Sequence, residues 1–125
     1  MRKSLTPLGE TEMEVLLHVW ELGEATVKEV QERILDKREV AYTTIMTVMK
    51  NLADKGYLKY RKEGLTYVYS PDKEPEKVRF SLIKDLVKKV FKDSPAELVQ
   101  TLVEGEDLSQ EEIEEIRRMI SRMED

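Results

Sequence analysis

The chain of 125 residues contains no cysteine and has no long apolar run. The absence of cysteine excludes disulfide bonds, thiolate metal clusters and a cysteine nucleophile. The apolar runs are far shorter than the roughly 18 residues that a membrane-spanning helix requires, and Met1-Arg2-Lys3 is followed by no hydrophobic signal region. We therefore expect a cytoplasmic protein without membrane insertion.

The sequence also shows no convergence of titratable side chains of the kind that catalysis requires. His18 is the only histidine, and the helical spacing around it predicts that it faces outward without a role. The acidic cluster Glu111, Glu112, Glu114 and Glu115 is better explained as the solvated start of a helix, where negative charge is favourable. We predict that the protein is not an enzyme and that it uses no metal and no cofactor.

The segment from Val40 to Pro71 predicts one amphipathic helix followed by a short β-hairpin. Gly56 is typical of a residue that ends a helix. Beyond it, residues alternate with the period of a strand on either side of a turn at Lys62-Glu63-Gly64-Leu65, which predicts the hairpin. The helical spacing assigns one buried face to four residues: Ile45, Val48, Met49 and Leu52.

Two further helices are expected before this segment. The first ends near Gly23, and the second begins at a capping box formed by Thr26 and Glu29. The apolar stripe of the first helix comprises Met13, Leu16, Leu17 and Trp20. The expected fold is therefore mainly α with a small β-hairpin, a winged helix-turn-helix domain.

Charge favours DNA as the partner of this domain over a structural helix and hairpin without a ligand. The stretch from Lys37 to Lys62 has seven basic and two acidic residues, a local charge of +5 on a chain of net charge -5. A protein-interaction module is the alternative, and Tyr67 could pack under the hairpin instead of contacting DNA. The residues expected at the DNA surface are Lys28, Tyr42, Thr43, Thr44, Met46, Thr47, Lys50, Asn51, Arg61, Lys62 and Tyr67.

The prolines at 71 and 75 predict a boundary between a DNA-binding domain at residues 1–71 and a helical domain at residues 72–125. The second domain should hold three helices whose apolar faces are too wide for so short a chain to bury alone, which favours a homodimer over a single monomeric core. The residues expected at the dimer interface are Val78, Leu82, Ile83, Leu86, Val87, Val90, Leu98, Leu102, Ile113, Ile116 and Ile120.

Several spaced motifs together resemble the BlaI/MecI/CopY family of penicillinase-repressor-type regulators. They are LGETEMEVLLHVW, TVKEV, VAYTTIMTVMKNLADKGYL, YVYSP and, further on, ELVQTLVEGEDLSQEEIEEIRRMI. The resemblance implies a homodimeric winged-helix repressor that binds double-stranded DNA at an inverted-repeat operator, with the third helix in the major groove and the wing near the phosphates.

Three departures limit what the resemblance implies. The cysteine pairs of the copper-responsive branch are absent, and Thr101-Leu102 stands where the resistance branch has a cleavable Asn-Phe bond. A sensor protease is therefore a partner that the local motif does not support, and a regulator that senses a ligand in a pocket of the C-terminal helices is an alternative. Met46 occupies the place of an arginine in the resistance branch, so apolar contact, for example with a thymine methyl, replaces bidentate contact with guanine.

Overall fold

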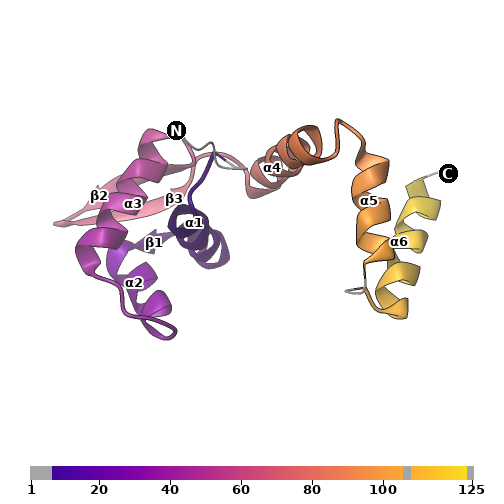
Figure 1. Cartoon of the computed structure of the whole chain (residues 1–125). Helices are drawn as coiled ribbons and strands as arrows, with labels where there is room; N and C mark the ends of the chain where they lie inside the picture. The colour runs from indigo at the N-terminus through magenta and orange to yellow at the C-terminus, as the bar shows by residue number, and fades with distance from the viewer. Residues whose placement is uncertain (1–6, 106–107, 124–125) are drawn as a thin grey trace. The chain divides into compact units, whose positions relative to one another are not determined.

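The computed structural model describes residues 7–105 and 108–123 of the chain, and these residues form six helices and one three-stranded sheet (Figure 1). The elements are α1 (Glu10–Leu22), β1 (Ala25–Thr26), α2 (Val27–Leu35), α3 (Tyr42–Asp54), β2 (Leu58–Glu63), β3 (Thr66–Pro71), α4 (Pro75–Val90), α5 (Pro95–Glu104) and α6 (Gln110–Met123). The predicted fold class, mainly helical with a small hairpin, is confirmed.

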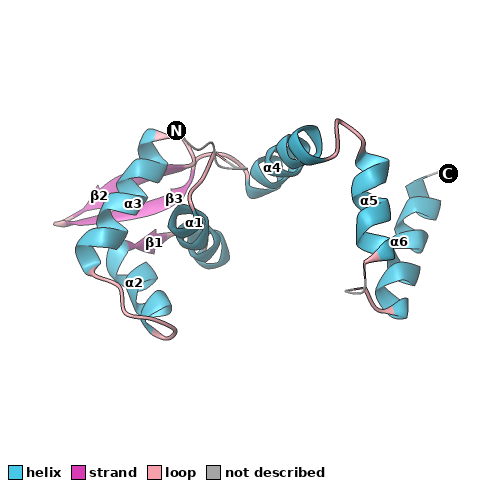
Figure 2. Ribbon diagram, viewed as in Figure 1, coloured by secondary structure: helices cyan, strands magenta, loops and turns pink. Residues whose placement is uncertain are grey.

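The sheet is antiparallel with the strand order β1-β3-β2. Figure 2 shows it next to the helices α1, α2 and α3. Its short edge strand β1 was not predicted, because Thr26 signals a helix start in the sequence. Thr26 in fact does both: it pairs with Val68 of β3, and its hydroxyl accepts the N–H of Glu29 at 3.2 Å to cap α2. The hairpin turn is shorter than predicted and consists of Gly64-Leu65. Gly64 has φ 62, a left-handed conformation that favours glycine at this position.

The core of the first unit forms where α1, α2 and α3 pack against each other and against the sheet. Ile45, Met49 and Leu52 of α3 are completely buried, and Val48 is partly buried, as predicted. The stripe predicted for α1 is partly wrong, because Val15 and Val19 are completely buried whereas Leu17 is 42% exposed. Helix α1 carries apolar residues on several of its faces. Its contacts with both α3 and β3 decide which of these residues are buried.

The chain divides into two compact units, Met1–Leu82 and Ile83–Asp125, with the division inside α4. The first unit thus extends beyond the predicted boundary at Pro71. The reason is that the first turns of α4 belong to its core: Val78 is 4% exposed and Leu82 packs against the same cluster. Val78, predicted at the dimer interface, is therefore a core residue of the first unit.

The second unit contains the end of α4, then α5 and α6. Among its described residues, only Val87 is buried. α4 is followed by Lys92 and Asp93, which both have positive φ, at 48° and 66°. The predicted caps form, since the N–H of Glu97 donates to the Ser94 hydroxyl at 3.2 Å and that of Glu112 to the Ser109 hydroxyl at 3.1 Å.

Candidate nucleic-acid interface

The outward face of α3 is polar, as the helical periodicity predicted. Thr43, Thr47 and Lys50 are exposed opposite the buried face. The N-cap residue of α3 is Ala41, which offers no side-chain cap, and the first turn of the helix has no acidic residue. Its first N–H groups and the positive end of its dipole are therefore available to an anion.

The remaining predicted contacts of α2 and α3 are also accessible. Tyr42, Thr44, Met46 and Asn51 are exposed on α3, and Lys28 is exposed on α2. In the part of the chain that the structure describes, neither Lys28 nor Lys50 forms an ion pair. Their positive charges are therefore free to attract phosphates.

The face of the wing that continues this surface is lined by tyrosines. The Tyr60 ring lies between two others, with its centroid 5.3 Å from that of Tyr67 and 5.5 Å from that of Tyr69. The ammonium of Lys62 lies 5.8 Å from the Tyr67 centroid. Tyr67 thus packs against the wing and still leaves 44% of its surface exposed, which allows both of the roles considered for it.

Helix α3 and the wing together enclose a groove of about 450 Å³. Its lining consists of Met46, Thr47, Lys50, Asp54, Tyr60, Tyr67 and Tyr69. Sequence reasoning missed Tyr60, Tyr69 and Asp54 as groove residues. All three carried a signal, because Tyr60 and Tyr69 lie on the same face of the hairpin as Tyr67, and Asp54 lies four residues after Lys50 and seven after Thr47 on the outward face of α3. Burial, with the neighbouring tyrosines, raises the pKa of Tyr69, so its hydroxyl keeps its proton at neutral pH.

Arg61 does not lie with the other wing residues. It alternates with Tyr60 and Lys62 along β2 and therefore projects from the opposite face of the hairpin. There its guanidinium is held by the carboxylates of Glu24 and Glu63. The hydrogen bonds to Arg61 lower the pKa of Glu24, so the pair stays ionised. Arg61 therefore does not share a face with Lys62 and Tyr67, with which the prediction had grouped it, because neighbouring residues of a strand point to opposite faces.

Other basic residues of the +5 stretch are also engaged. Lys55 donates to Glu12 at 2.8 Å and to the carbonyl of Pro7 at 3.3 Å, and Arg38 pairs with Glu14. Lys59 and Lys62 have no ion pair among the described residues. His18 is less isolated than expected, since Arg33 Nε donates to its Nδ1 at 3.1 Å.

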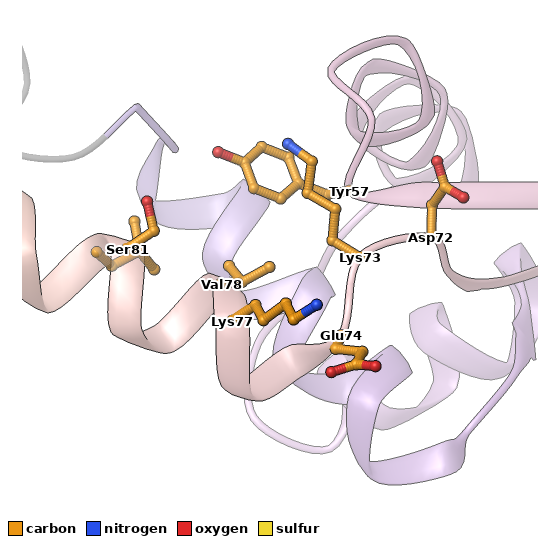
Figure 3. A pocket seen from close by; sticks show the side chains of 8 residues that line it. Tyr57, Asp72, Lys73, Glu74, Lys77, Val78 and Ser81 are labelled. Atoms are coloured by element: carbon orange, nitrogen blue, oxygen red, sulfur yellow. The ribbon is translucent and has the colours of Figure 1, made fainter.

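A separate hollow of about 430 Å³ lies where β3 leads into α4, within the first unit (Figure 3). Its apolar part is formed by Tyr57, Val78 and Leu82, and the ammonium of Lys73 lies 4.7 Å from the Tyr57 ring centroid. The positive charges of Lys73 and Lys77 are balanced by the negative charges of Asp72 and Glu74, so the lining carries no net charge. Four of its lining residues, Lys77, Val78, Ser81 and Leu82, lie on α4, the first of the three helices in which the alternative of a ligand sensor had placed its pocket. The hollow nevertheless belongs to the first unit, and α5 and α6 contribute nothing to its lining.

The residues predicted at the dimer interface differ in exposure. Val78 and Val87 are buried, whereas Leu82, Leu86, Leu98, Ile113 and Ile116 are partly buried. About half of the surface of the remaining four is exposed: Ile83, Val90, Leu102 and Ile120. Thr101 and Leu102 both lie exposed inside α5.

No group of three or more histidine, aspartate or glutamate side chains within residues 7–105 and 108–123 could hold a metal ion. None of the helices described there is long and apolar enough to cross a membrane.

Helix α2, the turn after it, α3 and the β2–β3 hairpin define a winged helix-turn-helix protein. Comparison with known proteins agrees with this class. The solution structure of the DNA-binding domain of the repressor BlaI matches with a TM-score of 0.51 and 27% identity, over 59% of this chain and 90% of that one. A mutant MarR from E. coli matches in fold, with a TM-score of 0.56 and 12% identity over 95% of this chain and 79% of that one.

The penicillinase repressor family model matches residues 8–122. The methicillin resistance regulatory protein MecI of Mammaliicoccus sciuri is 30% identical over 115 residues, which cover 92% of this chain and 94% of MecI. The transcriptional regulator BlaI of Mycobacterium tuberculosis is 29% identical over 121 residues, which cover 96% and 87% of the two chains. The chain belongs to the penicillinase repressor family, a family of transcriptional regulators.

Proposed function

We propose that this protein is a cytoplasmic, homodimeric repressor that binds an inverted-repeat DNA operator through α3 and the wing. The observation that carries the proposal is the groove between α3 and the wing. It joins the hydroxyl of Thr47, the carboxylate of Asp54, the wing tyrosines and the ammonium of Lys50 in one concave surface, and Lys50 forms no ion pair among residues 7–105 and 108–123. Relatives in the same family carry the names transcriptional regulator and penicillinase repressor.

In this proposal α3 enters the major groove. Thr43, Thr44 and Thr47 contribute hydroxyls to bases or phosphates, and Lys50 and Asn51 reach the backbone or a base edge. Met46, 43% exposed, offers a thymine methyl an apolar contact.

Phosphates outside the major groove are bound by other elements. Tyr42 lies at the start of α3, where the N-terminal N–H groups suit a phosphate, and Lys28 contacts the backbone from α2. Lys62 and Tyr67 contact it from the wing. Arg61 is left out of this set, because two carboxylates already occupy its guanidinium.

The second unit would supply the dimer contacts. Ile83, Val90, Leu102 and Ile120 leave an apolar surface that a second copy could cover, and paired units would place two α3 helices about one DNA turn, roughly 34 Å, apart. From Asp93 to Asp125 the chain has three basic and eleven acidic residues, so this part should face away from DNA. A dimer bound over a promoter would block transcription sterically.

Release by a sensor protease is not part of the proposal. The local pair is Thr101-Leu102 rather than Asn-Phe, and both residues lie within the hydrogen-bonded backbone of α5. Cleavage there would require the helix to unfold locally. The inducing signal is thus a separate question from DNA binding.

Selection of bound duplexes from a random pool tests the proposal. We expect enrichment of an inverted repeat whose half-sites lie about ten base pairs apart. A variant with Thr47 and Lys50 both replaced by alanine is the control and should enrich nothing. Failure of the unmodified protein to enrich any duplex would contradict the proposal and favour a protein-interaction module.

A further inference from the structure

The back of the wing carries a charged cluster formed by Arg61, Glu24 and Glu63. The guanidinium of Arg61 donates to both carboxylate oxygens of Glu24, from Nη1 at 2.9 Å and from Nη2 at 3.1 Å. It also donates to Glu63 Oε1, from Nε at 3.1 Å and from Nη2 at 3.0 Å. The cluster therefore has a net charge of -1 and uses most of the five N–H donors of the guanidinium.

The bond from Arg61 to Glu24 spans the width of the sheet. Arg61 stands on the edge strand β2 opposite Val68 of the central strand, and Val68 pairs in turn with Thr26 of the other edge strand. Glu24 immediately precedes that strand. The side chain of Arg61 thus crosses β3 to reach Glu24, on the face of the sheet that also carries the buried Val68.

This cross-link lies where the sheet narrows. β1 pairs only Ala25 and Thr26 with β3, so the hairpin beyond Val68 is a two-stranded ribbon that carries Lys62 and Tyr67. Two-stranded ribbons twist more strongly than wider sheets and are only marginally stable alone. A bidentate ion pair anchored in the neighbouring edge strand can restrict that motion.

We propose that Glu24 and Arg61 form a clamp that fixes the wing relative to α3, so that Arg61 is a positioning residue for DNA binding and not a phosphate contact. The inference rests on the proposed function. The clamp lies on the face of the hairpin opposite the tyrosines, and the cluster that it forms with Glu63 has a net charge of -1, which does not attract phosphate. The clamp restricts the wing before DNA binds. Lys62 and Tyr67 therefore lose less conformational entropy on binding.

The direction in which Glu24→Gln changes the Kd for DNA distinguishes a clamp from simple electrostatic repulsion between Glu24 and DNA. Removing a negative charge near DNA normally tightens binding, whereas breaking a clamp weakens it. We expect Glu24→Gln and Arg61→Met each to raise the Kd for the selected duplex about two- to fivefold, as an exposed bidentate pair allows. The double variant should be no weaker than the weaker single variant, because both substitutions remove the same bidentate ion pair.

The salt dependence of the Kd separates positioning from phosphate contact. Arg61→Met should leave the slope of log K against log salt unchanged, whereas Lys62→Met, the matched control on the other face of the wing, should reduce it by about 0.9 per half-site. Tighter binding by Glu24→Gln, a reduced slope for Arg61→Met, or additive effects in the double variant would each overturn the clamp.

Amide hydrogen exchange of the full chain without DNA keeps the clamp testable even if the proposed function fails. Both substitutions should speed exchange in the β2 and β3 segments next to the Gly64-Leu65 turn, with Arg61→Met at least as effective because it also removes the bonds to Glu63. The α3 amides serve as the internal reference and should not change. Unchanged exchange in the wing would overturn the clamp, whereas absence of any duplex binding by the unmodified protein would overturn the proposed function alone.

Discussion

Single residues on α3 carry the chemistry of the proposed DNA surface. Lys50 is exposed and unpaired among the described residues, and it lines the same groove as the wing tyrosines. Arg61 and Lys55 also carry positive charge, but Arg61 is held by the carboxylates of Glu24 and Glu63 and Lys55 by that of Glu12. Local charge counted along the chain therefore overstates the charge that DNA would meet, because ion pairs within the fold remove part of it.

The residue with the clearest expected effect on DNA affinity is Lys50. Lys50→Ala should weaken duplex binding and reduce the salt slope by about 0.9 per half-site, because one phosphate contact and its released counterion are lost. Fluorescence anisotropy titrations at several salt concentrations measure both quantities. Lys59→Ala, which removes an exposed lysine from the opposite face of the wing, should leave the slope unchanged. An unchanged slope for Lys50→Ala would remove Lys50 from the interface.

Glu12 links the start of α1 to Lys55 and should make stability depend on pH. Partial burial acts to raise the pKa of Glu12, but the hydrogen bond from the Gly9 N–H at 2.9 Å and the Lys55 ammonium together lower it below its ordinary value. A lowered pKa in the folded state stabilises the fold above the pKa of the unfolded chain, and this stabilisation is lost as the pH falls through the folded value.

We therefore expect Glu12→Gln to lower the free energy of unfolding by about 1 kcal/mol at pH 7, the size of a lost helix cap. The difference from the unmodified protein should shrink below about pH 4, where the carboxyl of Glu12 also loses its charge. Urea unfolding at both pH values measures it, with the exposed Glu32→Gln as the control. A difference that stays constant with pH would show that the ionised carboxylate is not responsible.

At the scale of elements, the connection between α4 and α5 stores backbone strain. Lys92 and Asp93 both adopt positive φ, and a side chain there costs roughly 1 kcal/mol relative to glycine, less for aspartate than for lysine. The N–H of Phe91 makes an ordinary helical bond to the carbonyl of Val87 at 2.9 Å, and the positive φ at Lys92 lets the N–H of Asp93 donate to the same carbonyl at 3.1 Å, which closes the end of α4.

Lys92→Gly should consequently raise the free energy of unfolding by about 0.5 to 1 kcal/mol, because glycine adopts this conformation without steric cost. The matched control is Lys88→Gly, four residues earlier on the exposed surface of α4, which should destabilise by about 1 kcal/mol. Thermal unfolding followed by circular dichroism distinguishes the two signs. Destabilisation by both substitutions would contradict strain at Lys92.

At the scale of the whole molecule, the second unit has little core of its own. Val87 is its one buried residue among those described, while Leu102 and Ile120 each expose about half of their surface. An apolar surface of this kind is typical of an interface that a second subunit covers. The division of the chain at Leu82 leaves the first unit with a complete core.

Leu102→Glu should therefore raise the dimer dissociation constant at least tenfold, because it places a charge in the apolar contact. Sedimentation equilibrium over a range of protein concentrations measures that constant. Thr101→Glu adds the same charge one residue earlier, away from the apolar face of α5, and should have a much smaller effect. A monomeric unmodified protein at all concentrations would contradict the dimer.

Local pattern was sufficient wherever one short segment decided the outcome. The period of Ile45, Met49 and Leu52 predicted the buried face of α3, and Thr26 and Ser109 marked the starts of two helices. The same reasoning failed for Leu17, because several faces of α1 are apolar and only its neighbours in space determine which face is buried. Glu24 could not be identified at all, since 37 positions separate it from Arg61.

The sequence by itself thus determined the class of the fold, the outward face of α3 and the family, because helix period, caps and turn glycines act within a few residues. The tertiary structure decided which charges remain free, which face of the wing continues the groove, and that Val78 belongs to the first core. These features depend on contacts between segments distant in the chain, and the free energy of such contacts is not contained in any local pattern.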